Sequence, residues 1–315
     1  IRRKPPMSAA VEEPAAIHRR VAVVYNPIKV DEDVFRRLVS AKAAEHGFAE
    51  PTFYRTTLAD AGEGVTRLAV AAGAELVLAA GGDGTARIVT TTLRDTGVVG
   101  AIIPIGTANL LARNLGISLD IPRALDIALT GQARAIDLAQ LVIDYDDENP
   151  VYFTGMAGIG FDAALMRDTD TWLKKTVGSA AYLVAFAQQL GYRPRVVRYR
   201  VDDGHHAQRK AVLILVGNTR SLQGGIDLFP DALVDDGRLD LLLASPRTLA
   251  GWARMLAIVV GRLRRTKVVE YHSGERFVID LDSDAPWELD GDTEGTGHHF
   301  EFSVLPGALH IIANR

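Results

Sequence analysis

The chain has 315 residues, of which 48% are hydrophobic and 23% are charged, a composition that is ordinary for a globular protein of about two domains. It contains no cysteine, which excludes disulfides and thiolate metal sites and favours a cytoplasmic location. The formal net charge is −4, so nucleic acid is not an expected partner, although local basic clusters can still meet a membrane.

Residues 1–16 are rich in proline, alanine and charge, and they are predicted to form a disordered tail. Because the first residue is Ile1, we expect the natural start at Met7 or upstream of the chain. The tail lacks the apolar core that a signal peptide needs. No stretch is apolar enough to span a membrane; the longest one without charge, at 176–192, contains polar residues and is predicted to be a buried or interfacial helix.

Residues 17–143 alternate between strand and helix patterns. Short apolar runs predict strands, and apolar residues at helical spacing predict the helices between them. The strands fall at 21–25, 53–54, 76–80 and 98–103, and the helices at 34–39, 65–72, 88–93 and 110–115. This alternation predicts a parallel sheet with helices on both faces, which binds its ligands at the carboxyl ends of the strands.

Residues 144–315 are predicted to form a mainly antiparallel β-sandwich. The strand-like runs, many of them separated by turn signals, fall at 151–153, 196–201, 211–216, 239–243, 277–281 and 300–304. Two helices are expected among them, at 176–190 and 249–265. The acidic, turn-prone stretch Asp144–Pro150 is the expected boundary between the two domains.

The loop Gly81-Gly82-Asp83-Gly84-Thr85 follows a buried strand and precedes a helix. Its glycines let the backbone approach a phosphate closely, and the helix start offers free N–H groups and a positive dipole end. The Thr85 hydroxyl can add a hydrogen bond. A carboxylate beside phosphates requires an intervening cation, so Asp83 indicates Mg²⁺. The alternative is an ordinary glycine-rich turn.

Two further strand ends carry residues that suit the same ligand. Gly106, Thr107 and Asn109 follow the next strand and open a helix, where Thr107 and Asn109 can bind a nucleotide or a phosphate. The alternative there is a helix start that is capped by Thr107. Asn26-Pro27 ends the first strand, and Lys29 after it can neutralise a phosphate.

These motifs, in this order, resemble the catalytic domain of the diacylglycerol kinase family, which is shared with sphingosine and ceramide kinases and with bacterial lipid kinases. The resemblance extends over nearly the whole chain. In the second half it rests on Gly158-Ile159-Gly160-Phe161-Asp162, Asn218, Phe229-Pro230-Asp231-Ala232, Asp235-Asp236-Gly237, Leu289-Asp290-Gly291-Asp292 and Pro306-Gly307-Ala308-Leu309. It implies an α/β first domain similar to NAD kinase and phosphofructokinase, a β-sandwich second domain, and a last strand that can return to the first.

The resemblance also implies an activity and its residues. The chain would be an ATP-dependent lipid kinase, by default one that converts diacylglycerol to phosphatidic acid, with Mg²⁺ as cofactor. Asp290 would be the general base that takes the proton of the lipid hydroxyl, and Asp83, Asp137 and Asp292 would belong to the catalytic Mg²⁺ network. The nucleotide would bind Asn26, Pro27, Lys29, Thr57, Gly81, Gly82, Asp83, Gly84, Thr85, Gly106, Thr107 and Asn109.

The resemblance implies a second, structural Mg²⁺ in the second domain. Asp236 would be its carboxylate ligand, together with backbone carbonyls near Leu233 and Arg238. The alternative reading of this segment is a plain β-turn at Asp235-Asp236-Gly237.

Three positions depart from the family's pattern. Asp292 stands where the family has Glu in its late Asp-Gly-Glu motif, so the charge is kept but reaches about one methylene less far. Leu110 stands where many members have Asp, so one carboxylate of the network is missing. Ile28-Lys29-Val30 replaces a small Ser/Gly pair after Asn26-Pro27.

Two basic clusters bear on how a lipid is reached. An apolar helix at 249–260 ends in Arg262, Arg264, Arg265 and Lys267, which suits a peripheral position at the inner face of a membrane; the alternative is a core-packed helix with a solvated basic end. Arg193, Arg195, Arg198 and Arg200 share one strand face, which faces either phosphate or membrane, or solvent. The eight His residues lack metal-ligand spacing, and His298-His299 is expected at the surface in a polar turn.

Two other functions fit parts of the sequence. A soluble kinase of the NAD kinase or phosphofructokinase kind has a similar glycine-rich loop, and Gly178-Ser179-Ala180-Ala181-Tyr182 echoes an NAD kinase motif, but no Asn-Glu pair is present to bind a second nucleotide. A non-catalytic nucleotide- or lipid-binding protein would explain Leu110 and Asp292, although Asp83, Asp137 and Asp290 are retained. The lipid, the nucleotide donor and the oligomeric state, including a homodimer, are open.

Overall fold

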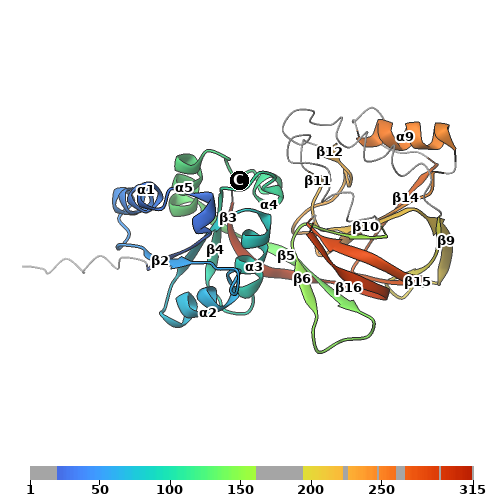
Figure 1. Ribbon diagram of the computed structural model, residues 1–315, viewed down its shortest axis with the longest axis horizontal. Helices are drawn as coiled ribbons and strands as arrows, with labels where there is room; N and C mark the ends of the chain where they lie inside the picture. The colour runs from blue at the N-terminus through green and yellow to red at the C-terminus, as the bar shows by residue number, and fades with distance from the viewer. Residues whose placement is uncertain are drawn as a thin grey trace, which may run out of the picture.

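The computed structural model describes residues 20–160, 194–222, 226–246, 248–259, 267–290 and 292–313 (Figure 1). The helix predicted at 176–190 lies outside these residues, as do Arg193, Arg262, Arg264 and Arg265. The described part of the helix predicted at 249–265 is α9 (Leu249–Val259). Within the described part of the chain, we find no helix that combines the length and apolarity needed to cross a membrane.

The first half is a parallel sheet with helices on both faces. Its strands lie in the order β4-β3-β1-β2, and they are β1 (Val21–Tyr25), β2 (Thr52–Arg55), β3 (Leu76–Gly81) and β4 (Val99–Pro104). β1 and β3 are buried along their whole length, as expected for strands that are covered on both sides. The helices are the short η1 (Pro27–Lys29), α1 (Glu32–Glu45), α2 (Glu63–Ala71), α3 (Asp83–Thr92), α4 (Leu110–Asn114) and α5 (Ile121–Thr130).

The helices form a core on each face of this sheet. α1 and α5 pack together over one face, where Phe35 and Leu125 are buried. α2 and α3 cover the other face, where Ala69 and Val89 are buried (Figure 1). The apolar sides of the helices therefore hold the strands in register and fix the positions of the loops at their ends.

The second half is mainly antiparallel. Its strands are β5 (Gln132–Ile143), β6 (Val151–Phe153), β7 (Met156–Ile159), β8 (Arg195–Val201), β9 (Ala207–Ala211), β10 (Leu213–Gly217), β11 (Ser221–Leu222), β12 (Ile226–Asp227), β13 (Leu239–Ala244), β14 (Val269–Gly274), β15 (Arg276–Leu289) and β16 (Asp292–Ala313). Tyr199, Leu241, Phe277 and Phe300 are among the side chains buried in its core. The predicted fold class, an α/β unit followed by an antiparallel β unit, is confirmed.

β15 and β16 are longer than the sequence predicts. The runs at 277–281 and 300–304 are parts of strands of 14 and 22 residues. The pairing of the two strands is interrupted by an irregularity between Asp280 and Ala285, which lets β15 pair first with β8 and then with β7. The polar residues at this bend hide the continuity of the strand from a pattern of apolar residues.

A ribbon of two strands joins the two halves. β5 and β16 pair in antiparallel fashion from Gln132 opposite Ala313 to Ile143 opposite Phe300. Near its end, β16 also pairs in parallel with β4, Ile311 lying opposite Gly100, and its earlier part pairs with β15. The last strand therefore returns to the first half and extends the parallel sheet (Figure 1).

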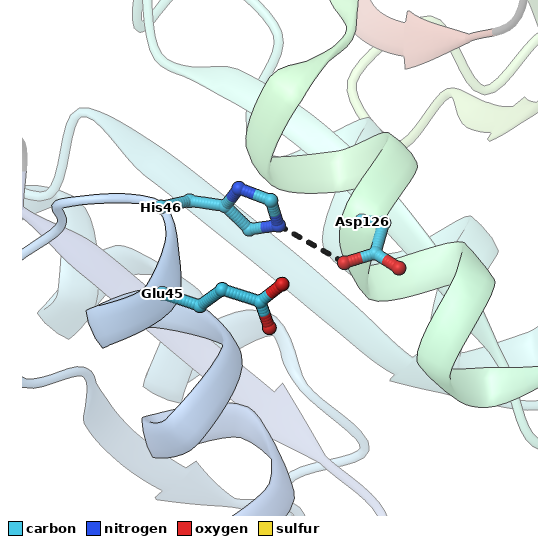
Figure 2. A group of neighbouring side chains, drawn as sticks. All are labelled: Glu45, His46 and Asp126. Carbon is cyan, nitrogen blue, oxygen red and sulfur yellow. Dashed lines mark hydrogen bonds and ion pairs between the residues drawn. The ribbon is translucent and has the colours of Figure 1, made fainter.

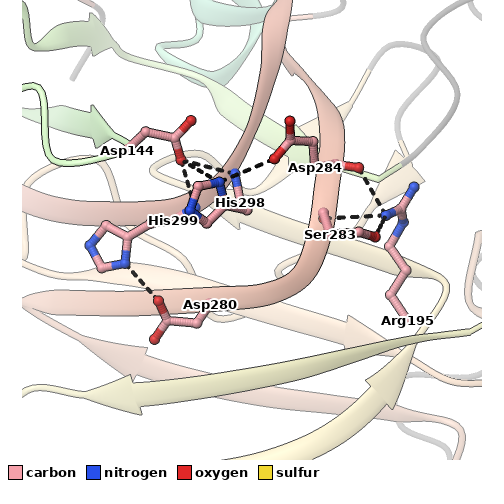
Figure 3. A network of polar contacts seen from close by, with 7 residues as sticks. All are labelled: Asp144, Arg195, Asp280, Ser283, Asp284, His298 and His299. Atoms are coloured by element: carbon pink, nitrogen blue, oxygen red, sulfur yellow. Dashed lines mark hydrogen bonds and ion pairs between the residues drawn. The ribbon is translucent and has the colours of Figure 1, made fainter.

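The predicted boundary at Asp144–Pro150 is a turn between β5 and β6. Its first residues, Asp144 and Tyr145, have φ of 48° and 66°. Asp144 accepts hydrogen bonds from the amides of His298 and His299 at 3.0 and 2.9 Å (Figure 3). The His299 ring stacks on Tyr145 at 3.9 Å and its Nδ1 lies 2.7 Å from Asp280. The expectation that both histidines lie at the surface in a turn is wrong for His299, which is buried on β16 because this network covers it.

The arginines of β8 are described from Arg195 onward. Val197 and Tyr199 are buried and Arg198 between them is exposed. Because side chains alternate along a strand, Arg198 and Arg200 share one face of β8 and Arg195 lies on the other. The expectation that these arginines share one face is therefore wrong for Arg195. Arg195 Nη1 donates to the Ser283 hydroxyl at 2.8 Å and to the Asp284 carbonyl oxygen at 3.0 Å (Figure 3). This arginine thus stabilises the bend of β15.

Candidate functional site

Three loops meet at the carboxyl edge of the parallel sheet. β1, β3 and β4 are neighbours there, so the loops that begin at Asn26, Gly82 and Ile105 share one edge. The amides of Ile105 and Gly106 donate to the carbonyl oxygen of Gly81 at 2.9 and 3.1 Å. A methyl group at Gly106 would lie 2.5 Å from the Cα atom of Gly82, so the two glycine-containing loops touch backbone to backbone.

Asp83 connects the Gly81 loop to the start of α4. Its carboxylate accepts hydrogen bonds from the amides of Asn109 at 2.9 Å and Leu110 at 2.5 Å, so Asp83 caps α4 in place of Thr107. The Asn109 side chain bonds the amide and the carbonyl oxygen of Gly106 at 3.0 and 2.8 Å. The sequence predicts that Asn109 binds the ligand through this side chain, but the structure commits it to shaping the loop.

The other predicted nucleotide ligands divide into exposed and committed side chains. Lys29 and Thr107 are exposed at the edge of the sheet. Asn26 and Thr57 each accept an amide hydrogen bond within their own turn, at 3.1 and 3.0 Å. Thr85 is buried. Lys29 and Thr107 are therefore the side chains most accessible to a ligand.

Asp290 and Asp292 reach this edge from the second half of the chain. Asp290 lies in the turn between β15 and β16 with φ of 51°, and its Oδ1 accepts a hydrogen bond from the Met156 amide at 2.9 Å. A methyl group at Gly155 would lie 2.0 Å from that oxygen, so a larger residue at this position would displace the Asp290 carboxylate. Asp292 Oδ2 lies 3.7 Å from where a methyl group on Gly84 would be, which places this turn over the first turn of α3.

Arg87 is a site residue that the sequence analysis missed. Its guanidinium lies 2.8 Å from Glu294 Oε1 and 3.9 Å from Asp290 Oδ2. It is the residue four positions after Asp83 on α3, so it occupies the same helix face. That spacing was the available signal, and Arg87 forms an ionic contact between the first half and the Asp290 turn.

Glu288 is a second site residue that was missed. It lies on β15, two positions before Asp290 in the turn that follows, and it is paired with Gly158 of β7 and Thr293 of β16. It is 9% exposed, and its Oε2 atom is buried without a hydrogen-bond partner among the described residues. The site thus holds one more carboxylate than the sequence predicts.

Asp137 lies in a different environment from Asp83. Its carboxylate accepts hydrogen bonds from the amides of Gly237 at 2.7 Å and Gly307 at 2.8 Å. The pKa of Asp236 is raised mainly by the burial of Asp236 itself, and the charge of Asp137 adds to this effect. The structure therefore connects Asp137 with the loop of the predicted structural cation site. The physical reason is that Asp137 sits inside β5, on the joining ribbon.

Comparisons with known proteins match both halves of the chain. Residues 20–141 match the diacylglycerol kinase catalytic domain, and residues 155–313 match the YegS C-terminal NAD kinase beta sandwich-like domain. A diacylglycerol kinase of Bacillus subtilis (strain 168) is 31% identical over 301 residues, which cover 93% of this chain and 96% of that protein. The chain belongs to this family of lipid kinases.

Other relatives and solved structures support the family and the fold. A protein named "Probable lipid kinase YegS-like" from Enterobacter sp. (strain 638) is 32% identical over 76% of this chain and 78% of its own. The crystal structure of a diacylglycerol kinase from Bacillus anthracis str. Sterne matches with a TM-score of 0.76 at 23% identity, covering 96% and 99% of the two chains. Yeast NADH kinase complexed with NADH matches at a TM-score of 0.51 and 9% identity, over 95% and 84% of the chains.

Burial raises the pKa values of three carboxylates at this candidate site, and neighbouring carboxylates add to the effect. Burial, then the charges of Asp292 and Asp290, raise the pKa of Glu288 to about 7. Burial raises the pKa of Asp290 to about 6, with Asp83 and Asp292 adding to the effect and the Met156 amide and Arg87 opposing it. Burial also raises the pKa of Asp83. The site therefore holds more negative charge than Arg87 balances.

Without bound cation, the Glu288→Gln variant should consequently be more stable than the wild type at pH 8. The folded-state pKa of Glu288 lies above its ordinary value of 4.5, so ionisation favours unfolding between about pH 4.5 and pH 7. The loss in the free energy of unfolding caused by ionised Glu288 grows through that pH window, is constant above it, and amounts to at most ~3 kcal/mol. Thermal unfolding of both proteins in chelator, from pH 5 to pH 8, measures it. An advantage of the variant that did not change with pH would contradict the expectation.

The same residues suit a divalent cation. Oxygen ligands are available from Asp83, Glu288, Asp290 and Asp292. The Oε2 atom of Glu288 has no hydrogen-bond partner among the described residues. Mg²⁺ usually takes one or two carboxylates and completes its shell with water and phosphate oxygens. The donor set therefore fits Mg²⁺ that enters together with a nucleotide.

The three-ligand group formed by Glu45, His46 and Asp126 is not such a site (Figure 2). His46 Nε2 lies 2.9 Å from Asp126 Oδ1. Lys42 Nζ lies 2.8 Å from the same oxygen and 3.0 Å from Glu45 Oε2. Because the ammonium group already supplies the positive charge, this cluster is an ionic junction between α1 and α5.

Proposed function

We propose that this chain transfers the γ-phosphate of ATP to the hydroxyl of a membrane lipid, by default diacylglycerol, to give phosphatidic acid. The observation that carries the proposal is Asp290. This carboxylate comes from the second half of the chain, is 7% exposed, and faces the start of α3, where the glycine-rich loop would hold the triphosphate. Phosphoryl transfer depends mainly on such positioning and on charge neutralisation.

In this mechanism the Asp290 oxygen not bound to Met156 accepts the proton of the lipid hydroxyl. The lipid oxygen then attacks the γ-phosphorus, the bond from that phosphorus to the β–γ bridging oxygen breaks, and ADP leaves. The Met156 amide and the turn at Asp290 keep the carboxylate oriented toward the hydroxyl. Good alignment of reacting groups lowers a barrier by several kcal/mol.

Charge near the phosphates is handled by residues of both halves. Asp83 and Asp292 would hold Mg²⁺, and Lys29 and Thr107 would contact the nucleotide from the neighbouring loops. When bound, Mg²⁺ neutralises the phosphate oxygens. Arg87 lies within reach of Asp290 and would hold that carboxylate in place between turnovers.

A second cation is proposed for the loop around Asp236. Asp236 with the backbone carbonyls of Leu233 and Arg238 would hold it, and Asp137 would stabilise it through the amides of the same loop. Burial, together with Asp236 and Asp231, raises the pKa of Asp240 next to this loop to about 6. A cation there would relieve the repulsion among these carboxylates and fix the start of β13.

We place the enzyme at the inner face of the membrane as a peripheral protein, with a homodimer left as an outcome to be measured. α9 is rich in apolar residues and has Ala250, Ala253 and Arg254 exposed. An apolar helix of this kind can lie in the headgroup layer of a bilayer. The lipid hydroxyl would then reach Asp290 while the lipid stays in the membrane surface.

The test is transfer of phosphate from γ-labelled ATP to a panel of lipids in mixed micelles with Mg²⁺. We expect a labelled lipid, with diacylglycerol the best acceptor, and no label with Asp83→Ala, because that variant loses both the cation ligand and the cap of α4. A labelled lipid other than diacylglycerol would change the substrate. ATP binding without any labelled lipid, or labelling of NAD instead, would refute the proposal.

A further inference from the structure

Glu288 is a buried acidic side chain without an ion-pair partner among the described residues. It is 9% exposed, and its Oε2 atom has no hydrogen-bond donor. The nearby cation, Arg87, is directed to Asp290 and Glu294. Removing a carboxylate from water without a partner is strongly unfavourable, so the position calls for a positive group that arrives from outside the protein.

The backbone is shaped to receive this carboxylate. A methyl group at Gly158 would lie 2.7 Å from Glu288 Oε1 and 2.9 Å from its Cγ, so the Glu288 side chain lies over Gly158. Two positions along, the Asp290 carboxylate lies over Gly155 in the same way. The Glu288 side chain therefore lies over a glycine of β7, and the Asp290 side chain lies over the glycine just before that strand.

We propose that Glu288 is a further carboxylate of the cation site beside Asp290 and Asp292, and that its Oε2 atom binds the divalent cation directly or through a cation-bound water. This inference rests on the proposed function, because the cation enters with the nucleotide. Asp292 has a short side chain and lies over α3, whereas Glu288 is longer and lies on the opposite strand of the same turn. Glu288 and Asp292 can therefore bind a hydrated cation from two sides.

The experiment measures Mn²⁺ binding with a non-hydrolysable ATP analogue, following free Mn²⁺ by electron paramagnetic resonance, with no lipid and no turnover. Glu288→Gln keeps the shape and removes the charge, and we expect it to weaken Mn²⁺ binding by about tenfold or more. Glu301→Gln is the matched control, because Glu301 lies on β16 in an ion pair with Arg276 and should bind Mn²⁺ as the wild type does.

Gly158→Ala is the second variant. It leaves every charge in place but displaces the Glu288 carboxylate, so it should also weaken Mn²⁺ binding. Wild-type affinity in both variants would overturn the assignment of Glu288 while leaving the kinase proposal intact. Absence of Mn²⁺–nucleotide binding in the wild type would instead overturn the proposed function and this inference with it.

Discussion

Asp290→Asn will fold like the wild type and lose lipid phosphorylation by about 1,000-fold, which is the size expected for loss of a general base. The Asn side chain keeps the oxygen that accepts the Met156 amide, so the turn should retain its shape. It cannot accept the proton of the lipid hydroxyl. The pKa of Asp290 is raised mainly by burial, so removing its charge should raise the melting temperature at pH 8.

The measurement compares turnover, ATP affinity and thermal unfolding. Asp282→Asn is the matched control, since Asp282 is an exposed carboxylate on β15, the strand that leads to Asp290, and the substitution should leave all three unchanged. Retention of full turnover by Asp290→Asn would remove this residue from the mechanism. Loss of ATP affinity in place of turnover would make it a nucleotide ligand.

Gly106→Ala will weaken nucleotide binding and destabilise the first half of the protein. The added methyl group would lie 2.5 Å from the Gly82 Cα atom and 2.8 Å from Asn109 Oδ1, and backbone cannot yield as a side chain end can. Overpacking of this kind costs about 1–3 kcal/mol. Because the displaced backbone belongs to the loop of Asp83, ATP affinity should fall by at least about tenfold, or ~1.4 kcal/mol.

Gly84→Ala separates the steric effect from a general effect of replacing glycine. A methyl group there would meet only Asp292 Oδ2, at 3.7 Å, and alanine favours the helix α3 in which Gly84 lies. Its melting temperature should therefore equal or exceed that of the wild type, while that of Gly106→Ala falls. Calorimetric titration with ATP and thermal scans of both variants give the comparison. Equal melting temperatures for the two variants would show that the loops yield and that their contact is unimportant.

The elements of the first half could be predicted because their signals are local. β1 and β3 are continuous apolar runs, and α1 has buried residues at helical spacing. β5 was not predicted as one strand of 12 residues, since its partner β16 is distant in sequence. The same limit applies to β15, whose polar bend interrupts the pattern although the strand continues.

The candidate site divides in the same way. Asp83 and Asp290 were predicted from motifs, but their surroundings depend on contacts between distant segments. Glu288 can be recognised as a site residue only when the strand that places it near Asp290 is known. Arg87 can be recognised only when it is known that the Asp290 turn lies over α3. Asp137 was predicted as a member of the catalytic network, and its contacts with the Asp236 loop depend on the pairing of the joining ribbon, which the sequence does not reveal.

The return of β16 to the first half has a consequence for biosynthesis. The parallel sheet has β4 as a neighbour of β16, and among the described strands β5 joins this sheet by pairing with β16. A nascent chain that has emerged as far as β5 therefore carries two strands whose partner has not yet been translated. The nucleotide-binding half can collapse early, but its sheet closes only after β16 leaves the ribosome, so chaperones have a long interval in which to bind the exposed edge.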